Sequence, residues 1–337
     1  MKDNQDKHIL EVDENDNWII SIDSIGEVHI ISKKYEATSY SLLLFEDNFE
    51  YLYMEWNVCP KLYITPDANY CIVTYGVGYL FFIDLQGRKV VKEYHLFPEV
   101  DYSNDSFQEI DWCCYYNEHT RVDFSESGKY AVVRVRGDFD PQESDGREDL
   151  FTPVYFCSFF IIDLCSFEIC LSDDFGDVCN AYKNIGAIAF NKSETLIAVG
   201  AFGSVIKIFN LTSRKCIDTL CSLMWMPDPL NLINCPLMLF LNDNILIYVN
   251  KDKNIVVCEL QNMSFVISEI IETNIPIIQR KTGNRVRDYK GEIKEVKMIA
   301  GEINCFVEYG YSKEYEVLKY KLGNCSVREK GCRAGNG

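Results

Sequence analysis

The sequence has few of the residues on which local catalytic and metal sites usually depend. Only four histidines occur in 337 residues, at positions 8, 29, 95 and 119, and no two of them have the spacing of metal ligands. The patterns His-Glu-x-x-His and Gly-x-Ser-x-Gly are missing. His29 alternates within a strand, so we expect it to face solvent. We therefore predict no catalytic, cofactor-binding or metal-binding residues. A Ser-His-Asp set could assemble only from distant positions.

Long apolar runs are missing as well. The longest, Val154–Cys165, has about twelve residues and contains a Ser and an Asp, whereas a membrane-spanning helix needs about 20. The N-terminal residues Met1–Asp16 contain no apolar stretch of the kind found in signal peptides. These two features predict a protein that has no membrane partner and is cytoplasmic.

Although the chain has 15 cysteines, it has no Cys-x-x-Cys pair. A zinc ribbon and a thioredoxin-like site are therefore not encoded. The count is odd, the spacing is scattered, and several cysteines lie within apolar strands. We expect these to be reduced core residues, since a free cysteine packs as a small hydrophobe. They are Cys71, Cys157, Cys258 and Cys305.

Basic residues are scarce: 33 Lys and Arg stand against 51 Asp and Glu, which gives a net charge of −18. A surface this negative repels phosphate backbones, so we predict no nucleic-acid partner. The charge favours a basic protein partner or serves solubility alone. Both interpretations stay open.

What the chain does contain is a repeat, clearest in Ile185–Leu220. This segment predicts a strand a at Ile188–Phe190, a strand b at Leu196–Gly200 and a strand c at Val205–Asn210, with a strand d at Lys215–Leu220. Polar turns separate the strands. Five further segments follow the same outline: Leu10–Lys34, Leu62–Leu85, Val122–Leu164, Leu237–Leu260 and Val296–Lys321.

The repeats begin about 50–60 residues apart, a period typical of radial all-β folds. They predict an all-β fold: a single β-propeller of six four-stranded blades, formed by residues 1–337 as one domain. The tail, 328–337, is expected to be flexible. A seventh blade could lie in Ser41–Val58 or Ile275–Lys290.

Strand c often ends in a polar residue followed by an apolar one, as in Asp84-Leu85, Asp163-Leu164, Asn210-Leu211 and Glu259-Leu260. We expect the polar side chain to accept hydrogen bonds from the amides of the next turn. With Phe209-Asn210 where WD repeats often have Trp-Asp, the chain resembles the WD-repeat β-propellers. It lacks their Gly-His and Trp-Asp signatures. The resemblance implies a protein-interaction platform.

Specificity is expected where the repeat is interrupted, at 97–118, 137–153 and 279–297. Segment 137–153 is strongly acidic, but its Gly146 does not stand where the glycine of a calcium loop stands. A loose cation site and a mobile acidic loop both remain open. Segment 97–118 combines carboxylates with aromatic residues, which suits a surface for Lys and Arg side chains or the packing of a core. Segment 279–297 is basic and predicts a hairpin that is solvated, binds an anion or pairs with acidic loops of the chain.

The resulting hypothesis is a non-catalytic propeller whose acidic rim loops engage a basic protein, with an immunity or antitoxin-type protein as one version. The alternatives are an enzyme with its site in the central channel and a structural subunit of a larger assembly. The oligomeric state is left open. The predicted partner-binding residues are Asp138, Asp140, Glu143, Asp145, Glu148, Asp149, Asp105, Glu109, Asp111 and Trp112.

Overall fold

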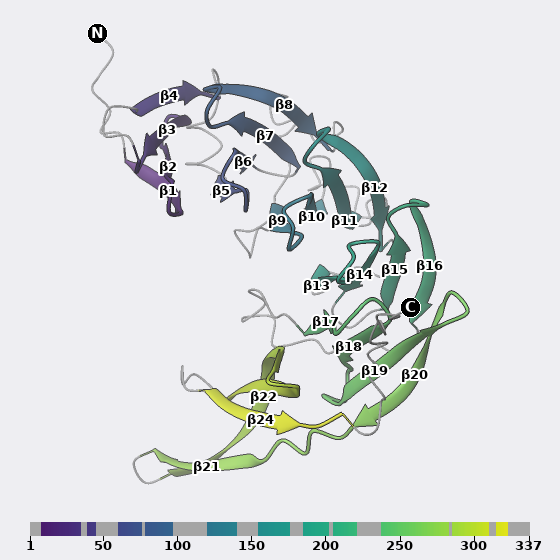
Figure 1. Ribbon diagram of the computed structural model, residues 1–337. Helices are drawn as coiled ribbons and strands as arrows, with labels where there is room; N and C mark the ends of the chain where they lie inside the picture. Colours follow the sequence, from purple (N-terminus) through teal and green to yellow (C-terminus); the bar gives the residue numbers. More distant parts are fainter. Residues whose placement is uncertain are drawn as a thin grey trace, which may run out of the picture. The chain divides into compact units, whose positions relative to one another are not determined.

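The computed structural model describes residues 8–34, 39–44, 60–75, 78–96, 120–139, 154–175, 185–201, 205–220, 237–282, 285–309 and 315–322. Within these ranges the chain forms strands and no helix, so no helix there could span a membrane. The strands make six four-stranded sheets in which each strand lies beside its neighbours in sequence (Figure 1). The predicted all-β fold of six four-stranded blades is confirmed.

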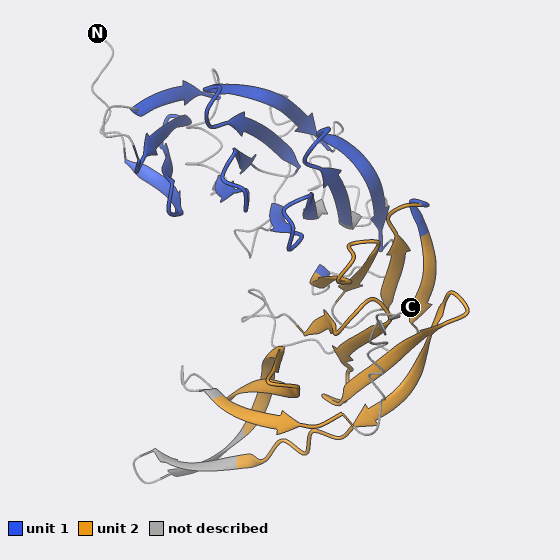
Figure 2. Cartoon of the chain, in the orientation of Figure 1, with its two compact units in different colours: residues 1–185, 213–215 blue, residues 186–212, 216–337 orange. Residues whose placement is uncertain are grey.

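The chain divides into two compact units, residues 1–185 with 213–215 and residues 186–212 with 216–337 (Figure 2). The first unit contains the first three sheets. Their strands are β1 Ile9–Glu14, β2 Trp18–Asp23, β3 Glu27–Ser32, β4 Ser39–Leu43, β5 Lys61–Ile64, β6 Tyr70–Tyr75, β7 Tyr79–Asp84, β8 Lys89–His95, β9 Thr120–Phe124, β10 Tyr130–Phe139, β11 Val154–Asp163 and β12 Glu168–Asp174.

The second unit contains the fifth and sixth sheets and nearly all of the fourth. The strands of these sheets are β13 Ile185–Phe190, β14 Leu196–Ala201, β15 Ile206–Asn210, β16 Lys215–Leu220, β17 Met238–Phe240, β18 Ile245–Val249, β19 Ile255–Gln261, β20 Ser264–Ile271, β21 Ile277–Thr282, β22 Arg285–Ile299, β23 Glu302–Tyr309 and β24 Tyr315–Tyr320. The prediction that 1–337 forms one domain stays a prediction.

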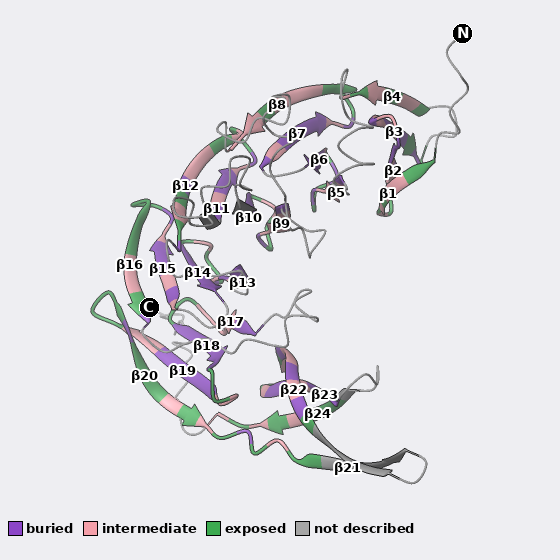
Figure 3. Cartoon of the chain, turned by 180° about the vertical axis from the view of Figure 1, so that it is seen from behind, coloured by how far each residue is buried: buried purple, intermediate pink, exposed green. Residues whose placement is uncertain are grey.

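Strand b is the buried centre of each repeat. Every residue of β14 and β18 is buried, whereas outer strands such as β4 and β20 alternate or are mostly exposed (Figure 3). In the second sheet, Val73 and Ile83 join a core with β2 and β3, while Ile72 and Phe82 join a core with β10 and β11. Since a middle strand is covered on both faces, its sequence is apolar without interruption.

Turn chemistry explains why the strands end where they do. Asp84 Oδ1 accepts hydrogen bonds from the amides of Gln86 and Gly87, at 3.0 and 2.7 Å, and Asp163 Oδ1 does the same for Cys165 and Ser166. The predicted role of the polar residue is thus confirmed in two repeats. The apolar residue after it donates its N–H to the carbonyl just before strand b. These pairs are Leu85 to Asn69, Leu164 to Lys129, Leu211 to Thr195 and Leu260 to Asn244.

The sixth sheet departs from the other five. Its second strand, β22, is 15 residues long, but β21 pairs only with residues 285–290 of it and β23 only with 291–299. Strand β23 holds the buried central position, with the pattern that strand b has elsewhere. Strands β21 and the first part of β22 therefore form a two-stranded ribbon that runs on past the sheet (Figure 1).

Neither proposed seventh blade is seen as a separate sheet in the described residues. Ser41–Leu43 belongs to β4 of the first sheet, and residues 45–59 lie outside the described part. Ile277–Lys290 belongs to the ribbon of the sixth sheet. The predicted tail, 328–337, also lies outside the described residues.

Candidate functional site

Most of the predicted partner-binding residues lie outside the part of the chain that the structure describes. These are Asp140, Glu143, Asp145, Glu148 and Asp149, together with Asp105, Glu109, Asp111 and Trp112. Asp138 lies on β10, where its backbone pairs with that of Tyr155. The assignment of all ten residues to partner binding stays a prediction.

The backbone around the acidic segment is nevertheless informative. Strands β10 and β11 pair without a break from Tyr130↔Asp163 to Phe139↔Val154. On the two sides, β9 stops at Thr120↔Val135 and β12 stops at Asp174↔Ser158. The last four pairs therefore form a two-stranded extension beyond the four-stranded sheet. The acidic segment 137–153 therefore begins on this extension, whose last described pair is Phe139↔Val154.

Residues 279–290 of the basic segment lie in a hairpin, which is the ribbon of the sixth sheet, whereas residues 291–297 pair with β23. In the register of the hairpin, Arg280 pairs with Arg287. In the part of β22 that pairs with β23, two lysines form ion pairs with carboxylates. Lys294 Nζ lies 2.9 Å from Glu292 and 3.6 Å from Glu308, and Lys297 Nζ lies 2.6 Å from Glu295.

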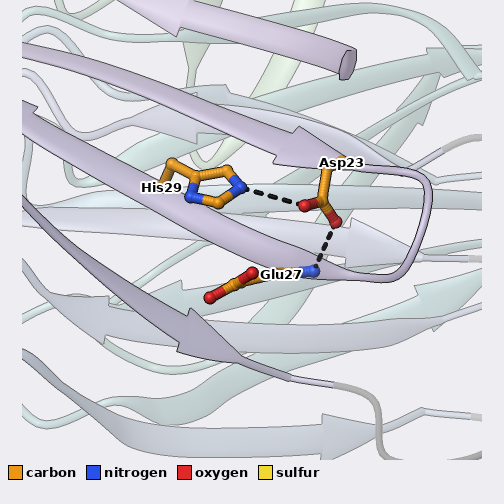
Figure 4. A group of neighbouring side chains, drawn as sticks. All are labelled: Asp23, Glu27 and His29. Atoms are coloured by element: carbon orange, nitrogen blue, oxygen red, sulfur yellow. Dashed lines mark hydrogen bonds and ion pairs between the residues drawn. The ribbon is translucent and has the colours of Figure 1, made fainter. Parts of the chain in front are cut away.

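Among the described residues, one group of potential metal ligands gathers at the β2–β3 turn (Figure 4). Asp23 is buried, and its Oδ2 lies 3.0 Å from His29 Nε2. Asp23 Oδ1 accepts the N–H groups of Ile25 and Glu27, at 3.1 and 3.0 Å, and Glu27 Oε1 accepts a hydrogen bond of 2.5 Å from Ser41. The side chain of His29, expected to face solvent, is 34% exposed, and its ring is also bonded to a buried carboxylate across the turn.

The fifth sheet contains the same turn, in which the neutral residue Asn250 takes the first position, the one that Asp23 occupies in the first sheet. Asn250 Oδ1 accepts the N–H groups of Asp252 and Asn254, both at 3.0 Å, two and four residues on, as for Asp23. The fourth residue of each turn has a positive φ, 79° at Gly26 and 64° at Lys253. A neutral amide fills the place of the carboxylate, so we interpret Asp23 as a turn-stabilising residue whose acceptor sites are already used.

This interpretation predicts different costs for two substitutions. Asp23→Ala leaves two turn amides without their acceptor and should lower the free energy of unfolding by about 2 kcal/mol. Asp23→Asn keeps an acceptor oxygen and should cost less than about 1 kcal/mol. Urea unfolding with and without Zn²⁺ measures both effects. A stabilisation by Zn²⁺ that both variants lose equally would instead identify a metal site.

Comparisons with known proteins find similar solved structures only at low sequence identity. No protein family matches the sequence, and no curated protein does. Among solved structures, the chain is similar to the β-propeller domain of Cps50 (Swd1) from Myceliophteria thermophila, at 10% identity and a TM-score of 0.37 over 73% of this chain. It is also similar to the Dos1 propeller, at 11% identity and a TM-score of 0.47 over 90% of this chain.

The chain spans 67% and 65% of the lengths of these two structures. The stronger observation is internal: six sheets follow one another along the chain, each with its strands in sequence order. In four of the sheets, the apolar residue at the end of strand c donates the same hydrogen bond to the residue before strand b. These features are those of a β-propeller built from six four-stranded blades.

Proposed function

We propose that this chain is a non-catalytic protein-interaction propeller of the cytoplasm whose acidic loops engage a basic protein partner. The observation that carries the proposal is the two-stranded extension of β10 and β11. Residues 137–139 of the acidic segment lie on this continuously paired ribbon, and residues 140–153 connect its two strands in sequence. Five carboxylates lie within residues 140–153 and Asp138 lies on the ribbon itself. Loops held on a rigid scaffold are where binding residues most often occur.

The charge of the whole chain supports the same class of partner. A net charge of −18 attracts a basic protein over distances of about a Debye length and raises the rate of encounter. Contacts of this kind weaken as the salt concentration rises. A basic toxin that the chain neutralises is one partner of this class, as is a basic subunit of a complex.

Co-purification from the native host, followed by mass spectrometry, tests the proposal. We expect one stoichiometric basic protein whose retention falls steeply with salt. A variant in which the six carboxylates are neutralised should lose it, with an affinity lowered by a factor of about 100 or more. The substitutions are Asp138→Asn, Asp140→Asn, Glu143→Gln, Asp145→Asn, Glu148→Gln and Asp149→Asn.

A matched variant removes the same charge elsewhere. It neutralises six exposed carboxylates on other strands and turns: Asp16, Glu126, Glu168, Asp174, Asp252 and Glu272. We expect it to keep its partner. If both variants lose the partner equally, net charge and not the acidic ribbon drives binding. Turnover of a small substrate by the purified chain, or its insolubility without other subunits, would favour an enzyme or an assembly subunit instead.

A further inference from the structure

A cavity of about 510 Å³ lies in the first compact unit, between the first sheet and two turns of the second. Its size falls in the range of small-molecule sites, about 300–1,000 Å³. It is separate from the acidic ribbon and from the Asp23 turn. The lining residues come from β2 to β4 and from the turns that follow β5 and β7, and they include Trp18, Lys34, Tyr40, Asp67, Asn69 and Arg88.

Two aromatic side chains of the cavity are held in place by the second sheet. Trp18 donates its indole N–H to the carbonyl of Ala68, at 3.0 Å. Tyr40 donates its hydroxyl to the carbonyl of Leu85, at 2.7 Å. Each ring is therefore tethered at its polar end, while its body lines the cavity. Side chains fixed before a ligand arrives lose little conformational freedom on binding.

The charge of the cavity is positive, in contrast with the chain as a whole. Lys34 and Arg88 line it, and the Arg88 guanidinium lies 5.2 Å from the centre of the Tyr40 ring. Among the described lining residues the one carboxylate is that of Asp67, which accepts hydrogen bonds from Thr65 Oγ1 at 2.6 Å and from the Asn69 side chain at 2.7 Å. Partial burial alone would raise the pKa of Asp67, but these hydrogen bonds lower it. Its charge is thus stabilised from within its own turn.

The backbone fixes Arg88 at the mouth of the turn. Its φ is 55°, and its N–H donates to the carbonyl of Asp84 at 2.9 Å. In the same turn, Asp84 Oδ1 accepts hydrogen bonds from the amides of Gln86 and Gly87. The Arg88 guanidinium lies over the Tyr40 ring. The planar guanidinium of arginine, with its five N–H donors, is well suited to bind an anion.

We propose that this cavity binds a small organic anion, a carboxylate or phosphate attached to a planar ring. The anionic group pairs with Arg88 and Lys34, and the ring packs against Trp18 and Tyr40. The amide side chains of the lining supply hydrogen bonds that orient the ligand. The site is independent of the proposed basic partner, which has the opposite charge preference.

Phenyl phosphate and benzoate are the probes, and the indole N–H resonance of Trp18 is the reporter. The chain has four tryptophans, so the Trp18 signal can be assigned by its loss in Trp18→Phe. Titration by NMR should shift this signal with either or both anions, and their relative affinities distinguish a phosphate from a carboxylate ligand. Uncharged benzamide, and inorganic phosphate alone, should bind at least about tenfold more weakly, since each lacks one of the two recognised parts.

Arg88→Gln should weaken phenyl phosphate or benzoate binding about tenfold, the value expected when one charge-assisted contact is lost. Arg88→Lys should recover part of that loss. Lys92→Gln is the matched control. Lys92 Nζ lies 5.0 Å from the centre of the Tyr94 ring, the same kind of contact outside the cavity. An unshifted Trp18 signal, equal binding of benzamide, or an equal loss in Arg88→Gln and Lys92→Gln would overturn the proposal.

Discussion

Replacing Phe82 with alanine is expected to lower the free energy of unfolding of the first compact unit by about 4 kcal/mol. Phe82 is fully buried on β7. Its ring meets those of Tyr94 and Phe167 edge-on, with centroids 6.2 and 5.5 Å away. The substitution would leave a cavity between the second and third sheets, and both the lost burial and the lost contacts carry a cost.

Calorimetry measures this effect as a fall of roughly 10 °C in the midpoint of the first unit, since about 1 kcal/mol corresponds to 2–4 °C for a unit of this size. Ile31→Ala serves as the control. Ile31 lies on β3 in the same unit, and its side chain is 45% exposed, so the change should stay within about 0.5 kcal/mol. Equal shifts in the two variants would contradict the placement of Phe82 in the core.

Replacing Gly291 with alanine is expected to lower the free energy of unfolding of the second compact unit by about 3 kcal/mol, the cost of overfilling a packed site. Gly291 stands where β22 leaves the ribbon and joins the sixth sheet. An added Cβ would lie 2.6 Å from carbons of Ile275 and of Val307, and 2.8 Å from Tyr309. All three atoms belong to side chains packed between strands, so the strand itself would have to shift.

Gly301→Ala distinguishes this steric effect from the general cost of replacing glycine. Gly301 has a positive φ of 78°, but beyond its two chain neighbours no atom of the described residues lies within 4 Å of a Cβ added there. Its replacement should cost about 1 kcal/mol, from backbone conformation alone. Midpoints of the second unit by calorimetry compare the two variants. If Gly301→Ala were the more destabilising, the close packing around Gly291 would be refuted.

The turn chemistry made the repeat predictable from the sequence. A polar residue at the end of strand c and an apolar residue after it have local partners, the next turn and the residue before strand b. Patterns of this kind are short in sequence, so they survive when the sequence signatures of a family are lost. The apolar strands b were equally clear, because both of their faces are covered.

The sixth sheet was harder to predict. The sequence correctly predicts a basic hairpin in 279–297, but not that one strand of 15 residues belongs first to the ribbon and then to the sheet. Strand β22 continues through Gly291 without a turn, so the sequence does not mark where the partner strand changes. Only the register shows it.

The Asp23–His29 contact and the cavity were missed for a different reason. Asp23 and His29 flank a turn whose polar residues are ordinary in number and type, and the signal was the match to Asn250 in another repeat. Trp18 and Arg88 both line the cavity, but they belong to different sheets. No spacing in the sequence relates two such residues, because their approach depends on how one sheet packs on the next.

Several hydrogen bonds between neighbouring sheets join residues about one repeat apart. Trp18 and Ala68 are 50 positions apart, Asp13 and Ile64 are 51, and Asp218 and Phe265 are 47. Contacts of this range form early relative to those between distant parts of a chain. A nascent chain leaving the ribosome can therefore fold one sheet before synthesis ends. The next sheet can then pack against the folded one as it emerges.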